Sequence, residues 1–353
     1  MKRIHQFAAG FNPGDAISNE ILAIRTILEN NGFAGNIYAK NIGLHLKDSK
    51  TVKKYYKYKY SPGDLIIYHH SIHSTVSNFV LNSLAPKFMI YHNVTPHHFF
   101  ESYDLKLTHY VKKGREELKN LKDKFMCYFA DSKYNREELN SLDFTNVHIL
   151  PIIYDFQKLQ KKESVKKDGF KNIIFVGRIA PNKKQDDLIR FAKMFKDYFC
   201  DKFKIHLVGY CSKELNLYKE ELDYMVKFYQ LDEHVLFSDY VDDDKLQEYY
   251  QSADLFISMS EHEGFCVPLI ESMFYEIPIL AYQAGAVGDT LNGAGISFNQ
   301  KDFLKICELV HIILKDQDFR NEIINSQNKR LKQFIDSRPE SILLEEIGRL
   351  QKI

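Results

Sequence analysis

FVGRIAPNKK, residues 175–184, joins an apolar run to a helix-like segment through a loop that contains a glycine and several cations. The run Ile173–Val176 has the length and β-branched content of a buried strand, and Gly177 follows it directly. Arg178 and Lys183 then lie in the loop before the next helix-like segment. Because ligands of open α/β sheets bind at the carboxyl ends of the strands, this stretch indicates an α/β fold with a ligand site at the loop.

The same alternation of apolar runs and helix-like segments extends in both directions. In the first half the expected strands are Arg3–Ala9, Asn36–Ala39, Asp64–Tyr68, Phe88–His92, Met126–Ala130 and Val147–Leu150. In the second half they are Ile173–Val176, Lys204–Val208, Val235–Phe237, Leu255–Ser258 and Ile279–Ala281. The clearest helix is Ala16–Asn31, which has a stripe of apolar residues along one side and Gly32 just past its end. This alternation predicts parallel, doubly wound sheets.

A polar, lysine-rich stretch divides the chain into two α/β halves. The stretch is Gln157–Gly169, and the alternation of strands and helices restarts after it. With 353 residues the chain is long enough for two domains of similar size. We expect an N-terminal domain at 1–158, a linker at 159–171, a second domain at 172–336 and a last helix at 337–353. Pro339 opens that helix, which we expect to pack back on the first domain.

SEHEGFCVPLIE, residues 260–271, is a second informative stretch and follows the buried run Asp254–Met259. Pro268 suits the first turn of a helix, whose free backbone amides can hold an anion at the edge of the sheet. Glu271 lies about one turn into this helix, where its carboxylate can accept hydrogen bonds from a ribose diol. Glu263 precedes the helix and can contact the sugar itself.

Each motif also has a plainer interpretation when it is taken alone. The fork of Arg178 and the point charge of Lys183 suit a diphosphate, but a surface loop with solvated charges contains the same residue types. Glu263 and Glu271 can likewise be ordinary surface glutamates, since two glutamates at this spacing are common by chance.

Taken together, the motifs resemble those of glycosyltransferase family 4. Glu263 and Glu271 within EGFCVPLIE resemble its Glu-x7-Glu signature, and GRIAPNKK upstream resembles its phosphate loop. GDAISNEI resembles the glycine loop after its first strand, and MIYHNVTP resembles the loop with its active-site histidine, which maps to His92. Two positions differ, because Cys266 and Lys184 stand where glycine is frequent. Cys266 adds a side chain beside the amides expected to hold the diphosphate.

The resemblance implies the GT-B fold, in which two Rossmann-like domains face each other across a cleft and the second binds most of the donor. It implies a retaining hexosyltransferase without metal or cofactor, with a nucleotide diphosphate sugar as donor and a glycan or lipid-linked acceptor. Bacterial cell-surface polysaccharide synthesis is the expected setting. The loop cations and the helix amides near Val267 would stabilise the leaving diphosphate, which is the role of a divalent ion in other enzymes.

The resemblance also assigns roles to individual residues. The expected catalytic residues are His92, Arg178, Lys183 and Glu263. The expected donor-binding residues are Gly14, Asp15, Gly177, Tyr240, Val241, Gly264, Phe265, Cys266, Val267 and Glu271, with base contacts made largely by the backbone near Tyr240 and Val241. His92 is expected to hydrogen-bond the transferred sugar or to help seat the acceptor. The alternative is a histidine whose bonds are satisfied within the core at a strand end.

Bulk properties argue against several other classes of protein. The formal net charge is +1, from 48 basic and 47 acidic residues, which does not favour nucleic acid as a partner. The five cysteines form no C-x-x-C pair, which favours reduced thiols over disulfides or a zinc knuckle. Because the N-terminus has no signal-peptide pattern and no apolar run approaches about 20 residues, we expect a cytoplasmic protein, with peripheral contact to the inner membrane face left open.

Two clusters resemble metal sites but have a simpler interpretation. Asp242–Asp244 matches the Asp-x-Asp pattern of metal-dependent glycosyltransferases, but it directly precedes the helix-like segment Lys245–Tyr250. Acidic residues are typical of a helix start, so we predict a capping role. His69, His70 and His73 lie close together without an evident cysteine or acidic partner nearby in the sequence, so we expect no metal site.

The segment Lys47–Tyr60 carries six lysines against one aspartate, interleaved with four tyrosines. It can be a solvated loop, or it can contact an anionic membrane surface or an acidic acceptor. Both interpretations stay open.

Two other functions compete with sugar transfer. One is a nucleotide-sugar epimerase of GT-B fold, and the other is a non-catalytic binding subunit that retains the fold. The presence of Glu263 and Glu271 together with Arg178 and Lys183 argues against both.

Overall fold

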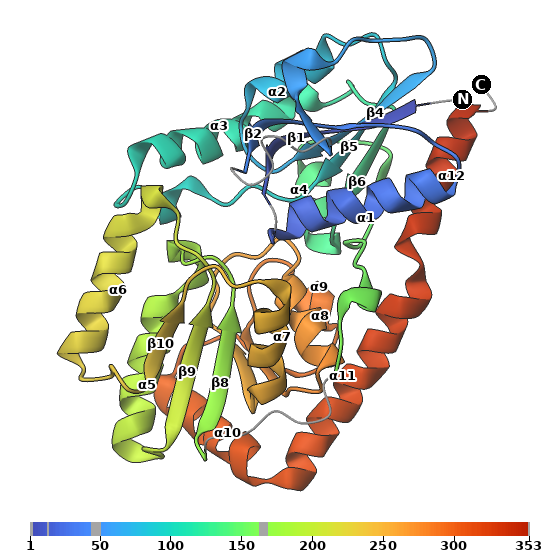
Figure 1. Cartoon of the computed structure of the whole chain (residues 1–353). Helices are drawn as coiled ribbons and strands as arrows, with labels where there is room; N and C mark the ends of the chain where they lie inside the picture. Colours follow the sequence, from blue (N-terminus) through green and yellow to red (C-terminus); the bar gives the residue numbers. More distant parts are fainter. Residues whose placement is uncertain (1–2, 13, 44–50, 162–168, 352–353) are drawn as a thin grey trace. The chain divides into compact units, whose positions relative to one another are not determined.

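The computed structural model describes residues 3–12, 14–43, 51–161 and 169–351. They form two compact units (Figure 1). The first unit is built from the described parts of 1–98, 106–156 and 338–353, and the second from those of 99–105 and 157–337. Much of the expected linker at 159–171 falls on 162–168, which lie outside the described residues.

The first unit is a parallel sheet with helices on its faces. Its strands are β1 (Arg3–Phe11), β2 (Ile37–Ile42), β3 (Val52–Lys54), β4 (Asp64–His70), β5 (Lys87–Tyr91), β6 (Cys127–Ala130) and β7 (Val147–Ile149). Its helices are α1 (Ala16–Asn30), α2 (Thr75–Leu81), α3 (Leu105–Leu121), α4 (Lys133–Ser141) and α12 (Pro339–Gln351). The strand order in space is β3-β2-β1-β4-β5-β6-β7, so the direction of winding reverses between β1 and β4. Ligands of doubly wound sheets bind at such a reversal.

Helix α1 shows how the apolar pattern produces the packing. Asp15 caps its N-terminus, where the carboxylate accepts a hydrogen bond from the amide of Ser18 at 2.9 Å. Ile24 and Leu28 are buried in a cluster that also contains Leu343 and Ile347 of α12. The last helix therefore shares the core of the first unit, although it follows the second unit in the sequence.

The second unit repeats the same architecture. Its strands are β8 (Lys171–Val176), β9 (Phe203–Val208), β10 (Val235–Ser238), β11 (Leu255–Ser258), β12 (Ile279–Tyr282) and β13 (Ile296–Phe298). Its helices are α5 (Gln185–Tyr198), α6 (Asn216–Phe228), α7 (Asp243–Ser252), α8 (Val267–Phe274), α9 (Val287–Leu291), α10 (Phe303–Lys315) and α11 (Gln317–Ser337). The strand order is β10-β9-β8-β11-β12-β13, and the reversal lies between β8 and β11. The predicted α/β fold of two parallel, doubly wound sheets is confirmed.

Two apolar clusters hold the second sheet between layers of helices. One cluster joins the sheet to α5, α6 and α10 through residues such as Phe191, Leu222 and Val310. The other joins the sheet to α7 and α8 through residues such as Tyr250 and Leu269. Both faces of the strands are thus buried, as expected for a parallel sheet.

The lysine-rich segment is partly structured. Residues 44–50 lie outside the described residues, and Val52–Lys54 add the edge strand β3, which the sequence analysis did not predict. Tyr58 is buried, and its hydroxyl donates to Asp64 at 3.1 Å. A fully solvated loop is therefore ruled out for this part of the segment, although Tyr56 and Tyr60 remain exposed.

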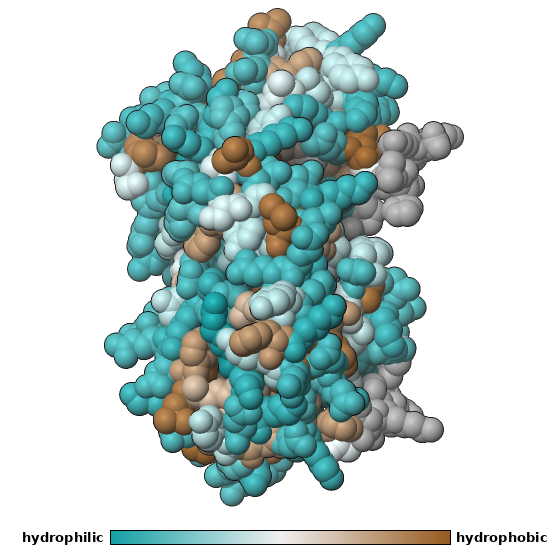
Figure 2. Space-filling view, turned by 90° about the vertical axis from the view of Figure 1, so that its left-hand side faces the viewer, coloured by the Kyte–Doolittle hydropathy of each residue, from teal (hydrophilic) through white to brown (hydrophobic). Residues whose placement is uncertain are grey.

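The face of the molecule shown in Figure 2 is mainly hydrophilic. On the face shown in Figure 2, hydrophobic residues occur in separate small groups. Among the described residues, no helix is both long and apolar enough to pass through a bilayer.

Candidate functional site

Two loops meet at the point where the second sheet reverses its winding. One follows β8 and contains Gly177–Lys184, and the other follows β11 and contains Met259–Cys266. Hydrogen bonds join them, since the Asn182 side-chain amide donates to the carbonyl of His262 at 3.2 Å and the amide of Glu261 donates to the carbonyl of Asn182 at 2.9 Å. The two motifs found 80 residues apart in the sequence therefore form one site.

An ion pair of Lys183 and Glu263 lies at the centre of this site. The Lys183 Nζ is 2.6 Å from the Glu263 Oε2, and the two side chains are 17% and 7% exposed. Removal of both charges from bulk water strengthens their attraction and makes either partner costly to leave unpaired. A ligand that brings its own phosphate and hydroxyl groups can separate this pair and give each partner a new contact.

Glycine and alanine from the loop after β12 fix the backbone of Glu263, and the sequence analysis missed both. The amide of Ala286 donates to the carbonyl of Glu263 at 2.9 Å. Gly285 has a φ of +55°, and a Cβ at this position would lie 2.3 Å from the same carbonyl oxygen. Only glycine fits this close approach. No motif predicts it, because the contact depends on the tertiary placement of the loop.

Helix α8 carries the second glutamate of the pair. Glu271 is 8% exposed, and its Oε2 accepts a hydrogen bond from the hydroxyl of Tyr250 at 2.6 Å. The ring of Tyr250 stacks on Tyr275 with centroids 5.4 Å apart. Tyr250 therefore orients the carboxylate, a role that spacing in the sequence could not reveal.

Cys266 has a left-handed backbone conformation, which glycine adopts readily. This conformation explains why glycine is frequent at this position in the family that the motif resembles. Cys266 is the N-cap of α8 with a φ of 71° and a ψ of 67°, in the left-handed region. Its side chain packs in the apolar cluster beneath α8, with Leu269 and Met273. Burial, with Glu263 nearby, raises the pKa of the Cys266 thiol well above its usual value, so the thiol stays protonated.

The remaining cations of the phosphate loop differ in their partners. Lys184 is also left-handed, with a φ of 54°, and its Nζ is 2.8 Å from the carboxylate of Asp186. Arg178 is exposed, and its guanidinium has no partner among the described residues, while its carbonyl accepts from the Gln185 side chain at 3.0 Å. Arg178 is thus the loop cation that is open to a new anionic ligand, together with Lys183 once its ion pair opens.

The other predicted donor-binding residues of this unit surround the same two loops. Gly177 follows β8, and Gly264, Phe265 and Val267 lie between β11 and the first turn of α8. Tyr240 and Val241 follow β10 at the same edge of the sheet.

Asp242 has the predicted capping role. Its side chain accepts from the amide of Lys245 at 2.8 Å at the start of α7. Helix capping therefore accounts for the first aspartate of the Asp242–Asp244 run.

The predicted residues of the first unit form a separate group. Gly14 has a φ of +83°. Asp15 caps α1 and also accepts from the Ser18 hydroxyl at 2.7 Å. His92 follows β5 directly rather than belonging to the strand, at the carboxyl edge of the sheet.

His92 belongs to a buried chain of polar side chains. Its Nε2 is 2.8 Å from His69 Nδ1, and its Nδ1 is 2.9 Å from Asp131 Oδ2 and 3.5 Å from Glu20 Oε2. His69 Nε2 is in turn 3.0 Å from Gln6 Oε1. The core-satisfied alternative thus describes its contacts, while the predicted contact with sugar remains a prediction. The sequence analysis missed Glu20 and Asp131 because each is distant from His92 in the sequence.

Two groups of side chains in the described residues have the composition of a metal site. Glu20, His69 and His92 offer ligand atoms within 4.8 Å of one another. The two imidazole nitrogens lie 2.8 Å apart, whereas two nitrogens on one tetrahedral zinc ion stand roughly 3.3 Å apart. The second group is Cys127, His148 and Glu346, where burial raises the pKa of the Cys127 thiol to about 12. Hydrogen bonding fits the first group better than a metal.

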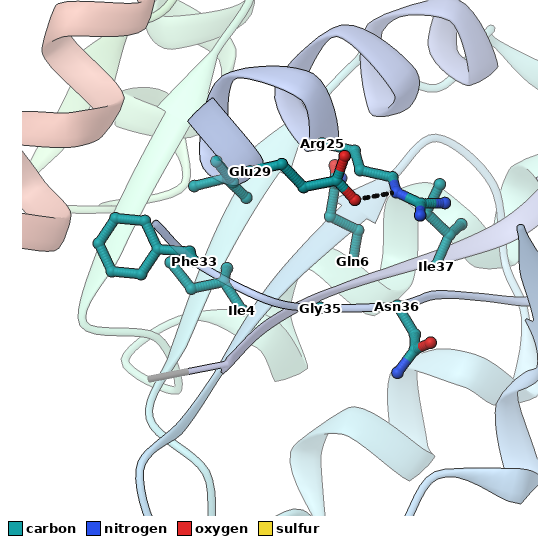
Figure 3. A pocket seen from close by; sticks show the side chains of 9 residues that line it. Ile4, Gln6, Arg25, Glu29, Phe33, Gly35, Asn36 and Ile37 are labelled. Carbon is teal, nitrogen blue, oxygen red and sulfur yellow. Dashed lines mark hydrogen bonds and ion pairs between the residues drawn. The ribbon is translucent and has the colours of Figure 1, made fainter. Parts of the chain in front are cut away.

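A small hollow lies elsewhere in the first unit (Figure 3). It is lined by Ile4, Gln6, Arg25, Leu28, Glu29, Phe33, Gly35, Asn36 and Ile37. The ion pair of Arg25 and Glu29 lies across it at 2.7 Å (Figure 3). Of these residues Gln6 belongs to the chain of polar side chains around His92. The hollow is a packing gap between α1 and the sheet, and it contains none of the predicted site residues.

Comparison with known proteins finds a family match in the second unit. Residues 156–330 match the family model of glycosyl transferases, group 1. The chain is 28% identical over 182 residues to the capsular polysaccharide biosynthesis glycosyltransferase CapM of Staphylococcus aureus, which is 50% of this chain and 45% of CapM. It is 26% identical over 167 residues, 46% of this chain and 44% of the relative, to a Campylobacter jejuni protein named GalNAc-α-(1→4)-GalNAc-α-(1→3)-diNAcBac-PP-undecaprenol α-1,4-N-acetyl-D-galactosaminyltransferase. The chain thus spans less than half of the length of these curated relatives.

The architecture of the whole chain also matches solved structures. HepE of Anabaena, crystallised with UDP and glucose, has a TM-score of 0.78 over 100% of both chains at 16% identity. At this identity the likeness establishes the fold. The two Rossmann-like units have the GT-B fold, as the resemblance implied.

Proposed function

We propose that this chain, whose second unit matches group 1 glycosyl transferases, is a retaining, metal-independent hexosyltransferase of family 4. The donor is a nucleotide diphosphate sugar, and the acceptor is a glycan or a lipid-linked glycan of a bacterial cell-surface polysaccharide. The name of the Campylobacter relative, which includes an undecaprenol-linked acceptor, supports the choice of acceptor class. The UDP in the HepE crystal supports a uridine nucleotide as the first donor to try.

The observation that carries this proposal is the contact of Lys183 with Glu263. The two residues come from different loops, and they meet where the winding of the sheet reverses. Lys183 would bind the diphosphate together with Arg178 and the amides at the start of α8, and would stabilise its charge as the glycosidic bond breaks. Glu263, released from Lys183, would face the sugar. Glu271 would accept hydrogen bonds from the ribose.

A panel of nucleotides and nucleotide sugars tests the donor. Ligand that binds the folded state raises the apparent melting temperature by mass action, so the matching nucleotide diphosphate should stand out. Incubation of that donor with candidate acceptors, followed by NMR of the product, should show transfer with retained anomeric configuration. Inversion would contradict the retaining mechanism. Donor isomerised at the sugar would indicate an epimerase, and binding without turnover across the acceptor panel would indicate a binding subunit.

Variants of the loop cations test the site. Lys183→Ala and Arg178→Ala should each lower kcat by about 10²-fold or more, because each removes stabilisation of charge on the leaving diphosphate. Lys184→Ala is the matched control, since Asp186 already neutralises Lys184, and it should change kcat by no more than about threefold. Turnover is measured as nucleoside diphosphate released at saturating donor. Near-normal turnover in both Lys183→Ala and Arg178→Ala would refute the assignment.

A further inference from the structure

The polar chain around His92 is buried along its whole length. Gln6, Glu20, His69, His92 and Asp131 are between 1% and 7% exposed. They come from β1, α1, β4 and the residues that follow β5 and β6, so four neighbouring strands and one helix meet in it. A buried polar network of this size is costly unless its donors and acceptors match, which makes the proton positions deducible.

The hydrogen bonds determine where the protons lie. The Gln6 side-chain amide donates to the carbonyl of Ile21 at 2.8 Å, so its Oε1 faces His69 as an acceptor. His69 therefore carries a proton on Nε2. Burial and the neighbouring His92 lower the pKa of His69, so it is neutral and its Nδ1 is an acceptor. His92 must then donate from Nε2 to His69, which leaves its Nδ1 facing the carboxylate of Asp131.

The charge of the pair follows from its surroundings. The Nδ1 of His92 and the Oδ2 of Asp131 share one proton, which belongs to the imidazole in an ion pair or to the carboxyl in a neutral pair. A carboxyl group is normally more acidic than an imidazolium by about 2.6 pKa units. The second carboxyl, Glu20, lies 3.5 Å from the same nitrogen. Burial opposes the charge, but Asp131, which is the strongest of the raising influences, brings the pKa of His92 to about 9.

Glu20 completes the balance of charge. Burial and the nearby Asp131 raise the pKa of Glu20 to about 8, so it is protonated at neutral pH. Its Oε1 accepts from the amide of Ile153 at 3.2 Å. Its Oε2 and the Oδ1 of Asp131 have no hydrogen-bond partner among the described residues. The network thus holds one cation, one anion and one neutral acid.

We propose that Asp131, Glu20 and His69 are positioning residues that hold His92 as a buried imidazolium with both N–H groups bound inside the first unit. This inference rests on the proposed function only for its kinetic consequence. An imidazolium has no lone pair, so His92 does not act as a general base for the acceptor hydroxyl below about pH 9. Its influence on transfer comes through its charge and through the loop that it anchors. In that loop Asn93 has a φ of 69°, and the carbonyl of Val94 accepts from Arg115.

Histidine NMR on the full-length protein tests the charge without any substrate. The ring carbon Cε1 is labelled in all 14 histidines, and the signals of His92 and His69 are assigned by their loss in His92→Gln and His69→Gln. We expect His92 to show the imidazolium shift from pH 5 to pH 8 and to titrate near pH 9. His69 should remain neutral throughout. A neutral His92 at pH 7 would overturn the proposal.

Asp131→Asn tests the role of the counter-ion. Loss of this carboxylate should lower the pKa of His92 by about 1–3 units, and Glu20→Gln should lower it less. Asp64→Asn is the matched control, because Asp64 is a buried carboxylate of the same unit that pairs with Arg3 instead. It should leave the His92 titration unchanged. An unchanged titration in both Asp131→Asn and Glu20→Gln would refute the assignment, and the second variant decides the matter if the first does not fold.

The pH profile of transfer gives the kinetic consequence. If His92 is an imidazolium, the kcat of the wild type should not rise between pH 6 and 8 through deprotonation of His92. The pH profiles of the wild type and His92→Gln should therefore have the same shape in this range. In Asp131→Asn the decline at alkaline pH should begin at lower pH, which a merely structural effect would not produce. An ascending limb near pH 6.5 that His92→Gln removes would identify a base and overturn the proposal. The NMR result is independent of whether the chain transfers sugar, so failure of the proposed function is distinguishable from failure of this one.

Discussion

Glu263 and Glu271 belong to one motif, but the structure gives them different surroundings. Glu263 pairs with Lys183 in front of α8, whereas Glu271 lies within α8 and is held by Tyr250. The first is released only when another group takes over Lys183, and the second is already oriented. The two residues should therefore contribute at different stages, Glu271 to binding of the donor and Glu263 to the chemical step.

Steady-state kinetics with varied donor separates these contributions. Glu271→Gln should mainly raise the donor KM, by about tenfold, because a ribose contact is unchanged during the reaction. Glu263→Gln should mainly lower kcat, by about 10²-fold, because the sugar gains positive charge as its bond to the diphosphate breaks. Tyr250→Phe keeps the Glu271 carboxylate but removes the hydroxyl that donates to it, so it should give a smaller rise in KM. The opposite division of effects would mean that the two roles are reversed.

Glu20 makes the stability of the first unit depend on pH. Burial raises its pKa to about 8 in the folded state, so the native state holds a proton that the unfolded chain releases at lower pH. The contribution of Glu20 to the free energy of unfolding is fully present below about pH 4.5 and is lost as the pH rises through about 8. His92, with its pKa raised to about 9, acts in the same direction. Glu20→Gln, which stays neutral, should gain stability relative to the wild type between pH 5 and pH 9.

Denaturant midpoints at pH 5 and pH 9 measure this difference. Glu29→Gln is the control, because Glu29 lies on the same helix in a half-exposed pair with Arg25. Its effect should be about the same at both pH values. If the difference in stability between Glu20→Gln and the wild type is the same at pH 9 as at pH 5, Glu20 ionises normally in the folded protein.

At the scale of the element, the sequence pattern was sufficient where each element carries its own signal. The stripe of α1, the strand before Gly177 and the Asp242 cap are local patterns, and all three were predicted. The edge strands β3 and β13 were missed because neither has the apolar run that marks the equally short β7, which continues into Leu150. The sequence of β3 is Val-Lys-Lys, and β13 directly follows Gly293 and Gly295. Site residues divide in the same way, since Lys183 and Glu263 belong to motifs, whereas Tyr250, Gly285 and Asp131 act through contacts that only the fold creates.

The start of α7 bears on the question of a metal. Asp242 is engaged in capping. Under the proposed function, Arg178, Lys183 and the amides of α8 would take the place of a divalent ion at the diphosphate. We expect transfer to continue at no less than about half of its rate in excess EDTA. Product formed with and without chelator, after removal of bound ions, is the measurement. Activity that EDTA abolishes and Mn²⁺ restores would contradict the metal-independent mechanism.

At the scale of the whole molecule, positive and negative charges nearly cancel, so attraction to a membrane requires a local surface. The described part of the lysine-rich segment provides one. Lys53, Lys57 and Lys59 are exposed, as are the rings of Tyr56 and Tyr60, at 63% and 42%. The rest of this segment is committed to the fold, since Tyr58 is buried and Lys54 donates to the carbonyl of Lys40 at 2.7 Å.

This surface should bind anionic vesicles reversibly. Each exposed lysine contributes about 1 kcal/mol near such a membrane, so three contribute about 3 kcal/mol, roughly a 100-fold preference over neutral lipid. Salt should weaken the binding, because screening shortens the reach of the surface potential. Sedimentation with phosphatidylserine-containing and neutral vesicles at low and high salt measures it. Replacement of Lys53, Lys57 and Lys59 by Gln should abolish most of the preference.

The control replaces three exposed lysines on another element of the same unit. These are Lys112, Lys113 and Lys119 of α3. Both triple variants change the net charge equally, so a difference between them reports on position rather than on total charge. If both variants lose binding to the same extent, the attraction belongs to the molecule's overall charge and not to this segment. If the wild type binds neither kind of vesicle at low salt, the membrane contact does not exist.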